Sequence, residues 1–356
     1  MLKNIINKLI INIIGRDTTE YISSNTMNLV MKKINPFIWT YDLKLLVLEK
    51  YYENESVITL TLLPNQHWQQ AKAGQYVELK FNINGKEYKR NYSISSIDKN
   101  IIKITIKRIE NGLISNWIHK NLNIGDEIQS SGALGNFIYK QQKKILFISA
   151  GTGITPCFSI FNDLIKNKNN LPDINFFSQF SKEKDLVFKN ELDTIKKNNF
   201  PNLKIDVITT KNKLTVNNFK EYFPDFMDRS IYLCGPEGFM TMVINILEKS
   251  NYDFNNLYIE NFYEKANLLN KENIISSKIY FKTYNKEVIL TKNDTKKTLL
   301  DIGLENGLNL EKGCKKGICG TCKLVLHEGD VIGNKLGKVV YLCTSYPNSE
   351  LVVIGT

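Results

Sequence analysis

Four cysteines near the carboxyl end of the sequence have the spacing of an iron–sulfur site. Cys314, Cys319 and Cys322 are arranged as C-x4-C-x2-C, and Cys343 follows farther along the chain. This is the plant-type pattern in which four thiolates bind the two irons of a [2Fe–2S] cluster. Structural zinc is the alternative, but zinc sites favour C-x2-C pairs that complete a tetrahedron. The spacing therefore predicts a protein that transfers single electrons.

Two glycines within this cysteine loop support the same interpretation. Gly317 and Gly320 lie between the first and the third cysteine. Glycine lets the backbone turn tightly and lets N–H groups approach the cluster sulfurs without a side chain in the way. We therefore expect the loop to wrap closely around the metal site.

Two glycine-containing turns have the composition of a nucleotide-binding site, because each follows an apolar run and precedes a predicted helix. Such glycines let backbone N–H groups approach a pyrophosphate, whose charge the helix dipole favours. The first turn lacks the full G-x-G-x-x-G pattern, so alone it fits a structural turn equally well. Together the two turns predict a nicotinamide nucleotide. They contain Gly151, Thr152, Gly153 and Thr155 in the first, and Cys234, Gly235 and Pro236 in the second.

A tetrad formed by Arg90, Asn91, Tyr92 and Ser93 lies within a predicted strand. Because side chains alternate along a strand, Arg90 and Tyr92 share one face and Ser93 lies on the other. An arginine can bind a phosphate through two hydrogen bonds, and a tyrosine can stack on a flat ring. Polar and aromatic alternation is ordinary in strands, so the tetrad by itself does not identify a ligand.

These residues are distributed over three predicted domains. Residues 41–140 contain short alternating runs separated by turns, which predicts an antiparallel β-barrel. Residues 141–264 alternate strands with helices, which predicts a doubly wound parallel sheet that binds ligands at the carboxyl ends of its strands. Residues 278–356 combine short strands, a helix and the cysteine loop. An extension, 1–40, and a linker, 265–277, complete the expected organisation.

Individual elements of the last two domains can also be predicted from these patterns. In the second domain we expect strands at 145–148, 175–179, 203–208 and 230–234, and helices at 189–197 and 216–222. In the third we expect strands at 278–283, 286–291, 323–326 and 351–354, and a helix at 298–304.

In this order, the tetrad, the two glycine turns and the cysteine loop resemble the ferredoxin–NADP reductase superfamily. More closely, residues 40–356 resemble the oxygenase- and desaturase-type reductases that end in a ferredoxin domain. The resemblance implies a multidomain fold in which the barrel binds FAD and the α/β sheet binds NAD(P). It implies that the ferredoxin domain is an α+β β-grasp fold, and that the cofactors are FAD, NAD(P)H and a [2Fe–2S] cluster.

The resemblance also implies roles for the residues around FAD. Arg90 would contact the pyrophosphate, Tyr92 would stack on the isoalloxazine, and Ser93 would hydrogen-bond toward flavin N5. A second phosphate turn favours FAD over FMN. Its residues are Gly112, Ile114 and Ser115.

For the nicotinamide nucleotide, the two glycine turns match the family's binding turns, and Cys234 matches a cysteine beside the nicotinamide. Ser93 and Cys234 are therefore the candidate catalytic residues, although a small buried side chain is the alternative for Cys234. Glu260 and Phe262 resemble the segment that closes the sheet domain against the flavin.

The choice between NADPH and NADH depends on the end of the second strand of the sheet. An acidic residue there would bind the ribose of NAD, but Ser181 and Lys182 follow this strand instead. This composition favours NADPH, with NADH as the alternative.

Composition and charge narrow the class of protein further. The net charge is +11, but the lysines are scattered among other residues. This does not predict nucleic-acid binding, and an acidic partner or a membrane surface fits better. Cys157 and Cys234 do not resemble a secreted disulfide framework, so we expect the cytoplasm. No apolar run is long enough to predict a membrane-spanning helix.

Residues 1–16 predict an amphipathic helix, because isoleucines and leucines recur at helical spacing beside Lys3, Lys8 and Arg16. This helix either packs on the protein itself or makes a peripheral contact with the inner face of the membrane. Asparagines interrupt the apolar run and no cleavage site follows, so a signal peptide is not expected.

These observations predict a reductase that passes electrons from NAD(P)H through FAD and the cluster to an oxygen-activating protein. A membrane fatty-acyl desaturase or hydroxylase is the favoured acceptor, because of the amphipathic extension. The first alternative is the reductase of a soluble Rieske-type ring-hydroxylating oxygenase. The second is a redox-sensing interaction module in which the cluster acts as a switch.

Overall fold

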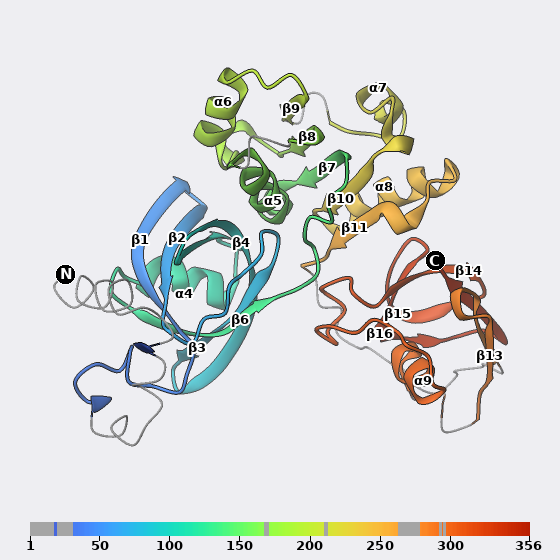
Figure 1. Ribbon diagram of the computed structural model, residues 1–356, viewed down its shortest axis with the longest axis horizontal. Helices are drawn as coiled ribbons and strands as arrows, with labels where there is room; N and C mark the ends of the chain where they lie inside the picture. The colour runs from blue at the N-terminus through green and yellow to red at the C-terminus, as the bar shows by residue number, and fades with distance from the viewer. Residues whose placement is uncertain are drawn as a thin grey trace.

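The computed structural model describes residues 18–19, 31–166, 171–209, 213–262, 278–291, 294 and 297–356. Figure 1 shows three domains, each built on its own sheet. The predicted helix in residues 1–16 and the predicted linker 265–277 lie outside the described residues. Within the described ranges, none of the helices has the length and apolar character needed to cross a membrane.

The first domain is a closed antiparallel barrel with the strand order β1-β2-β5-β4-β3-β6. Alternate valine, leucine and isoleucine side chains of the strands fill its interior. The predicted barrel is confirmed. One helix, α4, covers residues that the sequence predicted only as a turn. The elements are β1 Lys44–Asn54, β2 Val57–Pro64, β3 Tyr76–Ile83, β4 Lys86–Asp98, β5 Ile101–Lys107, α4 Leu113–Asn121 and β6 Glu127–Leu134.

The second domain is a parallel sheet with the order β11-β10-β7-β8-β9. The chain builds outward from β7 to one side and then returns to add β10 and β11 on the other, so β7 and β10 are neighbours at the point where the strand order reverses. The predicted doubly wound domain is confirmed. Its elements are β7 Lys144–Ala150, α5 Ile154–Lys166, β8 Asp173–Gln179, α6 Lys189–Lys197, β9 Leu203–Ile208, α7 Phe219–Tyr222, β10 Ser230–Cys234, α8 Glu237–Lys249 and β11 Leu257–Glu260.

The third domain is a mixed sheet with the order β13-β12-β17-β14-β16-β15, and one helix, α9, packs on it. This confirms the α+β prediction. A continuous cluster of buried apolar side chains runs from the parallel sheet into this domain. The elements are β12 Lys278–Phe281, β13 Lys286–Ile289, α9 Leu299–Glu305, β14 Lys323–Glu328, β15 Val331–Leu336, β16 Val339–Pro347 and β17 Leu351–Gly355.

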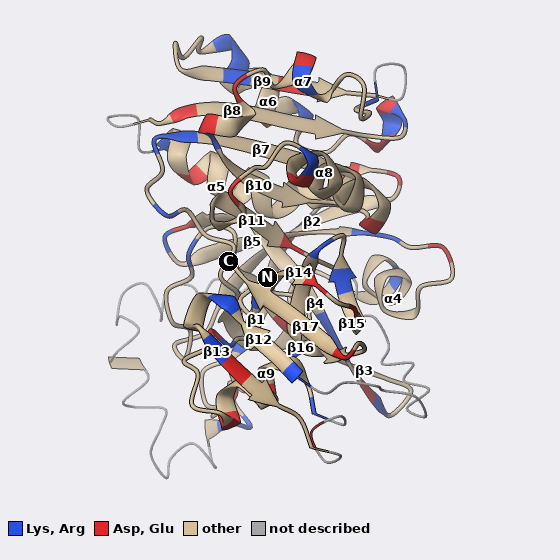
Figure 2. Cartoon of the chain, turned by 90° about the vertical axis from the view of Figure 1, so that its right-hand side faces the viewer, with Lys and Arg blue, Asp and Glu red and all other residues tan. Residues whose placement is uncertain are grey.

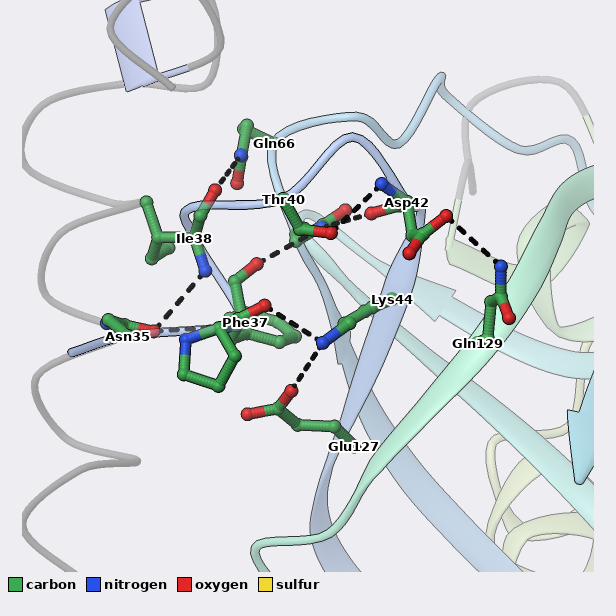
Figure 3. A network of polar contacts seen from close by, with 11 residues as sticks. Asn35, Phe37, Ile38, Thr40, Asp42, Lys44, Gln66, Glu127 and Gln129 are labelled. Atoms are coloured by element: carbon green, nitrogen blue, oxygen red, sulfur yellow. Dashed lines mark hydrogen bonds and ion pairs between the residues drawn. The ribbon is translucent and has the colours of Figure 1, made fainter. Parts of the chain in front are cut away.

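Residues 31–40, the described end of the predicted extension, pack against the barrel. The Phe37 side chain is fully buried and joins Leu46 of β1 in a small apolar cluster. Figure 3 shows the polar contacts around it: Lys44 Nζ donates to the Pro36 carbonyl and pairs with Glu127, at 2.9 Å in both cases. This segment is therefore part of the barrel domain's packing.

Charged residues of both signs are spread over the described elements, as Figure 2 shows. This agrees with the scattered lysines of the sequence.

Candidate functional site

Ser93 and Glu260 meet where the barrel contacts the parallel sheet. The Ser93 hydroxyl on β4 donates a hydrogen bond to Oε1 of Glu260, the last residue of β11, at 3.4 Å. Glu260 is only 2% exposed, and burial raises the pKa of its carboxyl to about 8, although the Ser93 hydrogen bond lowers it. The second oxygen, Oε2, is buried and has no hydrogen-bond partner among the described residues.

Glu260 also links Ser93 to the other candidate catalytic residue. Cys234 at the end of β10 is the register partner of Glu260 on the adjacent strand β11. The Cys234 side chain is fully buried, and burial raises the pKa of its thiol well above the ordinary value, with a contribution from the Glu260 charge. The structure thus brings both predicted catalytic residues to one carboxyl group. The sequence assigned Glu260 only to a closing segment, because no strand was predicted at residues 257–260. The alternation of Leu257 and Ile259 before Glu260 was the available signal.

A cavity of about 320 Å³ lies over this site, and all three domains line it. The floor is one face of the β3–β4 pair, because Tyr76 pairs with Ser93 and Glu78 with Asn91 in the strand register. The end of the parallel sheet and the cysteine loop form the other walls. The sheet contributes Glu260 and Phe262, and the cysteine loop contributes Lys316 and Ile318.

The remaining tetrad residues lie around this cavity in different ways. Arg90 lines it and is exposed, with its guanidinium donating to the Lys89 carbonyl at 2.7 Å. Tyr92 is half-buried and packs against the barrel core. The cavity and the orphaned Glu260 oxygen fit a flat polar ring such as isoalloxazine. The individual contacts of Arg90 and Tyr92 with FAD stay predictions.

The second predicted phosphate turn lies at the start of α4. Gly112 precedes the helix, so Ile114 and Ser115 lie in its first turn, where backbone N–H groups have no partner within the helix. Ser115 Oγ accepts a hydrogen bond from the Ile109 N–H at 3.1 Å. In this structure the Ser115 hydroxyl thus closes the turn, and the N–H groups at the helix N-terminus are those that fit a phosphate. The phosphate contacts of Gly112, Ile114 and Ser115 stay predictions.

The two nucleotide turns touch each other at the reversal point between β7 and β10. A Cβ added to Gly153 would lie 2.3 Å from the Cys234 carbonyl oxygen and 2.7 Å from the Gly235 nitrogen. By contrast, Gly151 has a φ of +55° and no atom within 4 Å of an added Cβ. Gly153 is therefore required by packing, whereas Gly151 faces an open space that fits a pyrophosphate.

The other residues of these turns support the same geometry. Thr155 Oγ1 donates to the Thr152 carbonyl at 2.6 Å and fixes the turn into α5. Pro236 immediately precedes α8, which begins at Glu237. Both turns thus lead into helix N-termini beside the carboxyl ends of neighbouring strands, and this fits the predicted nucleotide site.

The four cysteines of the loop lie in two pairs. Cys314 and Cys319 contact each other, with backbone N–H to sulfur distances of 3.4 and 3.5 Å, and Cys322 hydrogen-bonds to Cys343. The Lys316 N–H donates to the Cys314 sulfur at 3.3 Å. The Cys319 thiol and these N–H groups lower the pKa of Cys314 to about 5.

This paired arrangement fits two irons with two thiolates each. Within the part of the chain that the structure describes, no group of three or more His, Cys, Asp or Glu side chains is gathered closely enough to hold a single metal ion. The pairing of the cysteines, with two thiols for each iron, is what fits a [2Fe–2S] cluster.

The loop turns through its glycines, as expected. Gly317 and Gly320 have φ values of +70° and +68°. A Cβ at Gly317 would lie 2.5 Å from Asn334 Nδ2, and one at Gly320 would lie 2.6 Å from the Ile259 carbonyl of β11. The second contact brings the cysteine loop directly against the parallel sheet.

Three family models match the chain in succession. They are an oxidoreductase FAD-binding domain over residues 42–139, an oxidoreductase NAD-binding domain over 147–245, and a 2Fe-2S iron-sulfur cluster binding domain over 282–348. FAD, NAD(P)H and a [2Fe–2S] cluster are therefore the cofactors of this chain.

The curated relatives include reductases of similar length. The glycine betaine monooxygenase reductase subunit of Chromohalobacter salexigens is 26% identical over 323 residues, which cover 79% of this chain and 86% of that protein. The NADPH oxidoreductase of Mycobacterium tuberculosis is 25% identical over 336 residues, which cover 92% of this chain and 85% of that protein.

Among solved structures, phthalate dioxygenase reductase has the same fold. Its title describes a modular structure for electron transfer from pyridine nucleotides to [2Fe-2S]. The TM-score is 0.55 at 20% identity, and the match covers 89% of this chain and 98% of that one. The chain belongs to the ferredoxin–NADP reductase superfamily, as an NAD(P)H oxidoreductase whose flavin and nucleotide domains precede a [2Fe–2S] ferredoxin domain.

Proposed function

We propose that this chain is the reductase component of an oxygenase system and delivers electrons from NAD(P)H, one at a time, to an oxygenase protein. The observation that carries the proposal is the cavity whose walls come from all three domains. FAD and the cluster, when bound, would lie next to one another here, because the barrel, the sheet domain and the cysteine loop all line this cavity. Relatives named as monooxygenase reductase subunits, which match over most of their length, support an oxygenase as the acceptor.

The chain's own residues bind and orient the cofactors. Bound FAD converts a two-electron hydride transfer into single-electron steps, and the cluster carries one electron at a time. Gly151 leaves room for the nucleotide at the reversal point of the sheet, and Gly153 lets the two nucleotide turns pack together there. The Ser93 hydroxyl donates to Glu260, and a carboxyl pKa of about 8 keeps a proton on Glu260 at neutral pH, beside the cavity.

An anaerobic absorbance titration tests the electron path and the nucleotide preference together. The purified protein should show flavin bands and broad cluster absorbance, and stoichiometric NADPH should bleach both more readily than NADH. A colourless protein would contradict the proposal. Equal bleaching by both nucleotides would contradict the preference that Ser181 and Lys182 favour.

The Cys319→Ser variant tests the order of the path. Because Cys319 is one of the cluster ligands, we expect loss of electron transfer to cytochrome c, while NADPH still bleaches the flavin. Stopped-flow absorbance at the flavin band and a cytochrome c assay measure the two steps separately. Loss of flavin reduction as well would show that the assigned order is wrong.

A membrane desaturase is a second candidate acceptor, because the sequence pattern of residues 1–16 is amphipathic. Sedimentation with anionic vesicles tests this pattern on the full chain and on a chain that lacks residues 1–30. This deletion leaves Phe37 in the chain, so the packing of Phe37 on the barrel is kept. Vesicle binding that the deletion abolishes would favour the desaturase, and no binding by the full chain would favour the oxygenase.

A further inference from the structure

Two neighbouring side chains of β3 contact the cysteine loop of the ferredoxin domain. Glu78 Oε2 forms an ion pair with Lys316 Nζ at 2.6 Å. Two residues earlier on the same strand, the Tyr76 hydroxyl hydrogen-bonds to the thiol of Cys314. Residues two apart on a strand share a face, so a single face of β3 contacts the loop at two points.

The ion pair is placed where it can orient the loop. The Glu78 side chain is 15% exposed and that of Lys316 is 44% exposed, so the carboxylate is mostly shielded from water. Lys316 lies between Cys314 and Cys319, and its own N–H donates to the Cys314 sulfur. Movement of Lys316 would therefore move the backbone that surrounds the first pair of cysteines.

The parallel-sheet domain holds the other side of the same loop. The Asn261 N–H donates to the Ile318 carbonyl at 3.2 Å. Lys323, immediately after the last cysteine of the loop, donates through Nζ to the carbonyls of Phe254 and Leu257. On this side the contacts are to backbone atoms. The barrel side combines the Tyr76 contact with the ion pair of Glu78 and Lys316, and Lys89 lies 3.9 Å from the other oxygen of Glu78.

We propose that Glu78 and Lys316 are positioning residues that fix the cysteine loop over the flavin cavity and thereby set the rate of electron transfer into the cluster. The inference rests on the proposed function, because it concerns the step in which one electron leaves the reduced flavin and enters the cluster. Both residues line the cavity. Electron transfer slows steeply when donor and acceptor move apart, so loss of the ion pair should slow this step more than hydride uptake.

Charge reversal of each partner and of both tests the proposal in the cofactor-loaded full chain. In the Lys316→Glu variant two carboxylates face each other, which is strongly unfavourable. We expect the rate of cluster reduction, divided by the rate of flavin reduction by NADPH, to fall about tenfold, a change of about 1.4 kcal/mol. The Glu78→Lys variant should behave alike, and the Glu78→Lys/Lys316→Glu double variant should recover most of the ratio.

Lys312→Glu is the matched control, because it makes the same charge change just before the cysteine loop and outside the residues between the cluster ligands. Lys312 is exposed. The ratio of rates should stay close to that of the unmodified chain.

Hydrogen–deuterium exchange of the loop amides provides a readout that does not depend on turnover. Exchange in residues 314–320 should increase in each single variant and return toward normal in the double variant. Unchanged exchange and an unchanged ratio in Lys316→Glu, or a double variant as slow as the singles, would overturn the proposal. Failure of the unmodified chain to reduce its cluster would instead overturn the proposed function.

Discussion

At the scale of single residues, Glu260 is the group around which the site is assembled. It accepts a hydrogen bond from Ser93 of the barrel and faces Cys234 across the β10–β11 register. The burial that raises its pKa to about 8 also makes the charged form costly. A carboxyl with the ordinary pKa of 4.5 would be ionised at neutral pH. Burial instead keeps Glu260 protonated beside the cavity.

The Glu260→Gln variant should reveal this cost as a pH dependence of stability. The ordinary pKa of 4.5 rises to about 8 on folding, so the stabilisation by the bound proton is complete below about pH 4.5 and is lost as the pH rises through 8. Glutamine has no such dependence. The unmodified chain should therefore lose stability relative to the variant between pH 5 and 8, by up to about 1.4 kcal/mol per pH unit.

Thermal denaturation of the FAD-loaded proteins across this pH range measures the difference. Glu55→Gln, at an exposed position, is the control and should follow the unmodified chain. Parallel stability curves for Glu260→Gln and the unmodified chain would show that Glu260 is not protonated in the folded protein.

The residue scale also shows what sequence spacing can predict. The cysteine ligands lie close together in the chain, so local spacing sufficed to group them. Ser93 and Glu260 are 167 positions apart, and Glu78 and Lys316 are 238 apart. Such contacts depend on how whole domains pack, and local patterns carry no information about that packing.

At the scale of elements, the two nucleotide turns can pack together between β7 and β10 only because Gly153 has no side chain. The Gly153→Ala variant should force the two nucleotide turns apart, because the new Cβ would lie 2.3 Å from the Cys234 carbonyl. We expect at least a tenfold rise in KM for NADPH and a loss of about 1–3 kcal/mol in the free energy of unfolding.

Steady-state kinetics and urea denaturation measure the two effects. Gly238→Ala is the matched control, because it lies in α8 with no atom within 4 Å of an added Cβ. This control should leave KM for NADPH unchanged and change the free energy of unfolding by less than about 1 kcal/mol, because Gly238 is only the second residue of α8. A Gly153→Ala protein with normal KM and stability would show that the turns tolerate separation.

The elements of the parallel-sheet domain were the easiest to predict. Helix α6 at Lys189–Lys197 and strand β10 at Ser230–Cys234 have the predicted bounds, because apolar runs and helical periodicity alternate clearly there. In the last two domains, strands β11, β15 and β16 were missed. Every residue of β16 is buried, so no alternation marks it, and β15 contains Gly333 and Asn334, which weaken a strand pattern.

At the scale of the whole molecule, the nucleotide and ferredoxin domains share one apolar cluster. Lys338 of the β15–β16 turn also pairs with Glu248 of α8 at 2.8 Å. Because shared burial couples the two domains, we predict that they unfold together. Cluster absorbance and far-ultraviolet circular dichroism should follow the same thermal transition. Loss of cluster absorbance well before the loss of secondary structure would contradict this coupling.

The three-domain cavity has a consequence for the fate of the electrons when no partner is present. Its third wall, Lys316 and Ile318, belongs to the ferredoxin domain, so on the proposed electron path the accepting domain would also cover the flavin. A variant in which this wall is displaced should let dioxygen reach the flavin. The reduced flavin would then reduce dioxygen to hydrogen peroxide, and NADPH would be consumed without electron transfer to a partner. If the proposed positioning role holds, the contact between Glu78 and Lys316 also limits oxidation by dioxygen, and the amount of peroxide formed per NADPH consumed measures this effect.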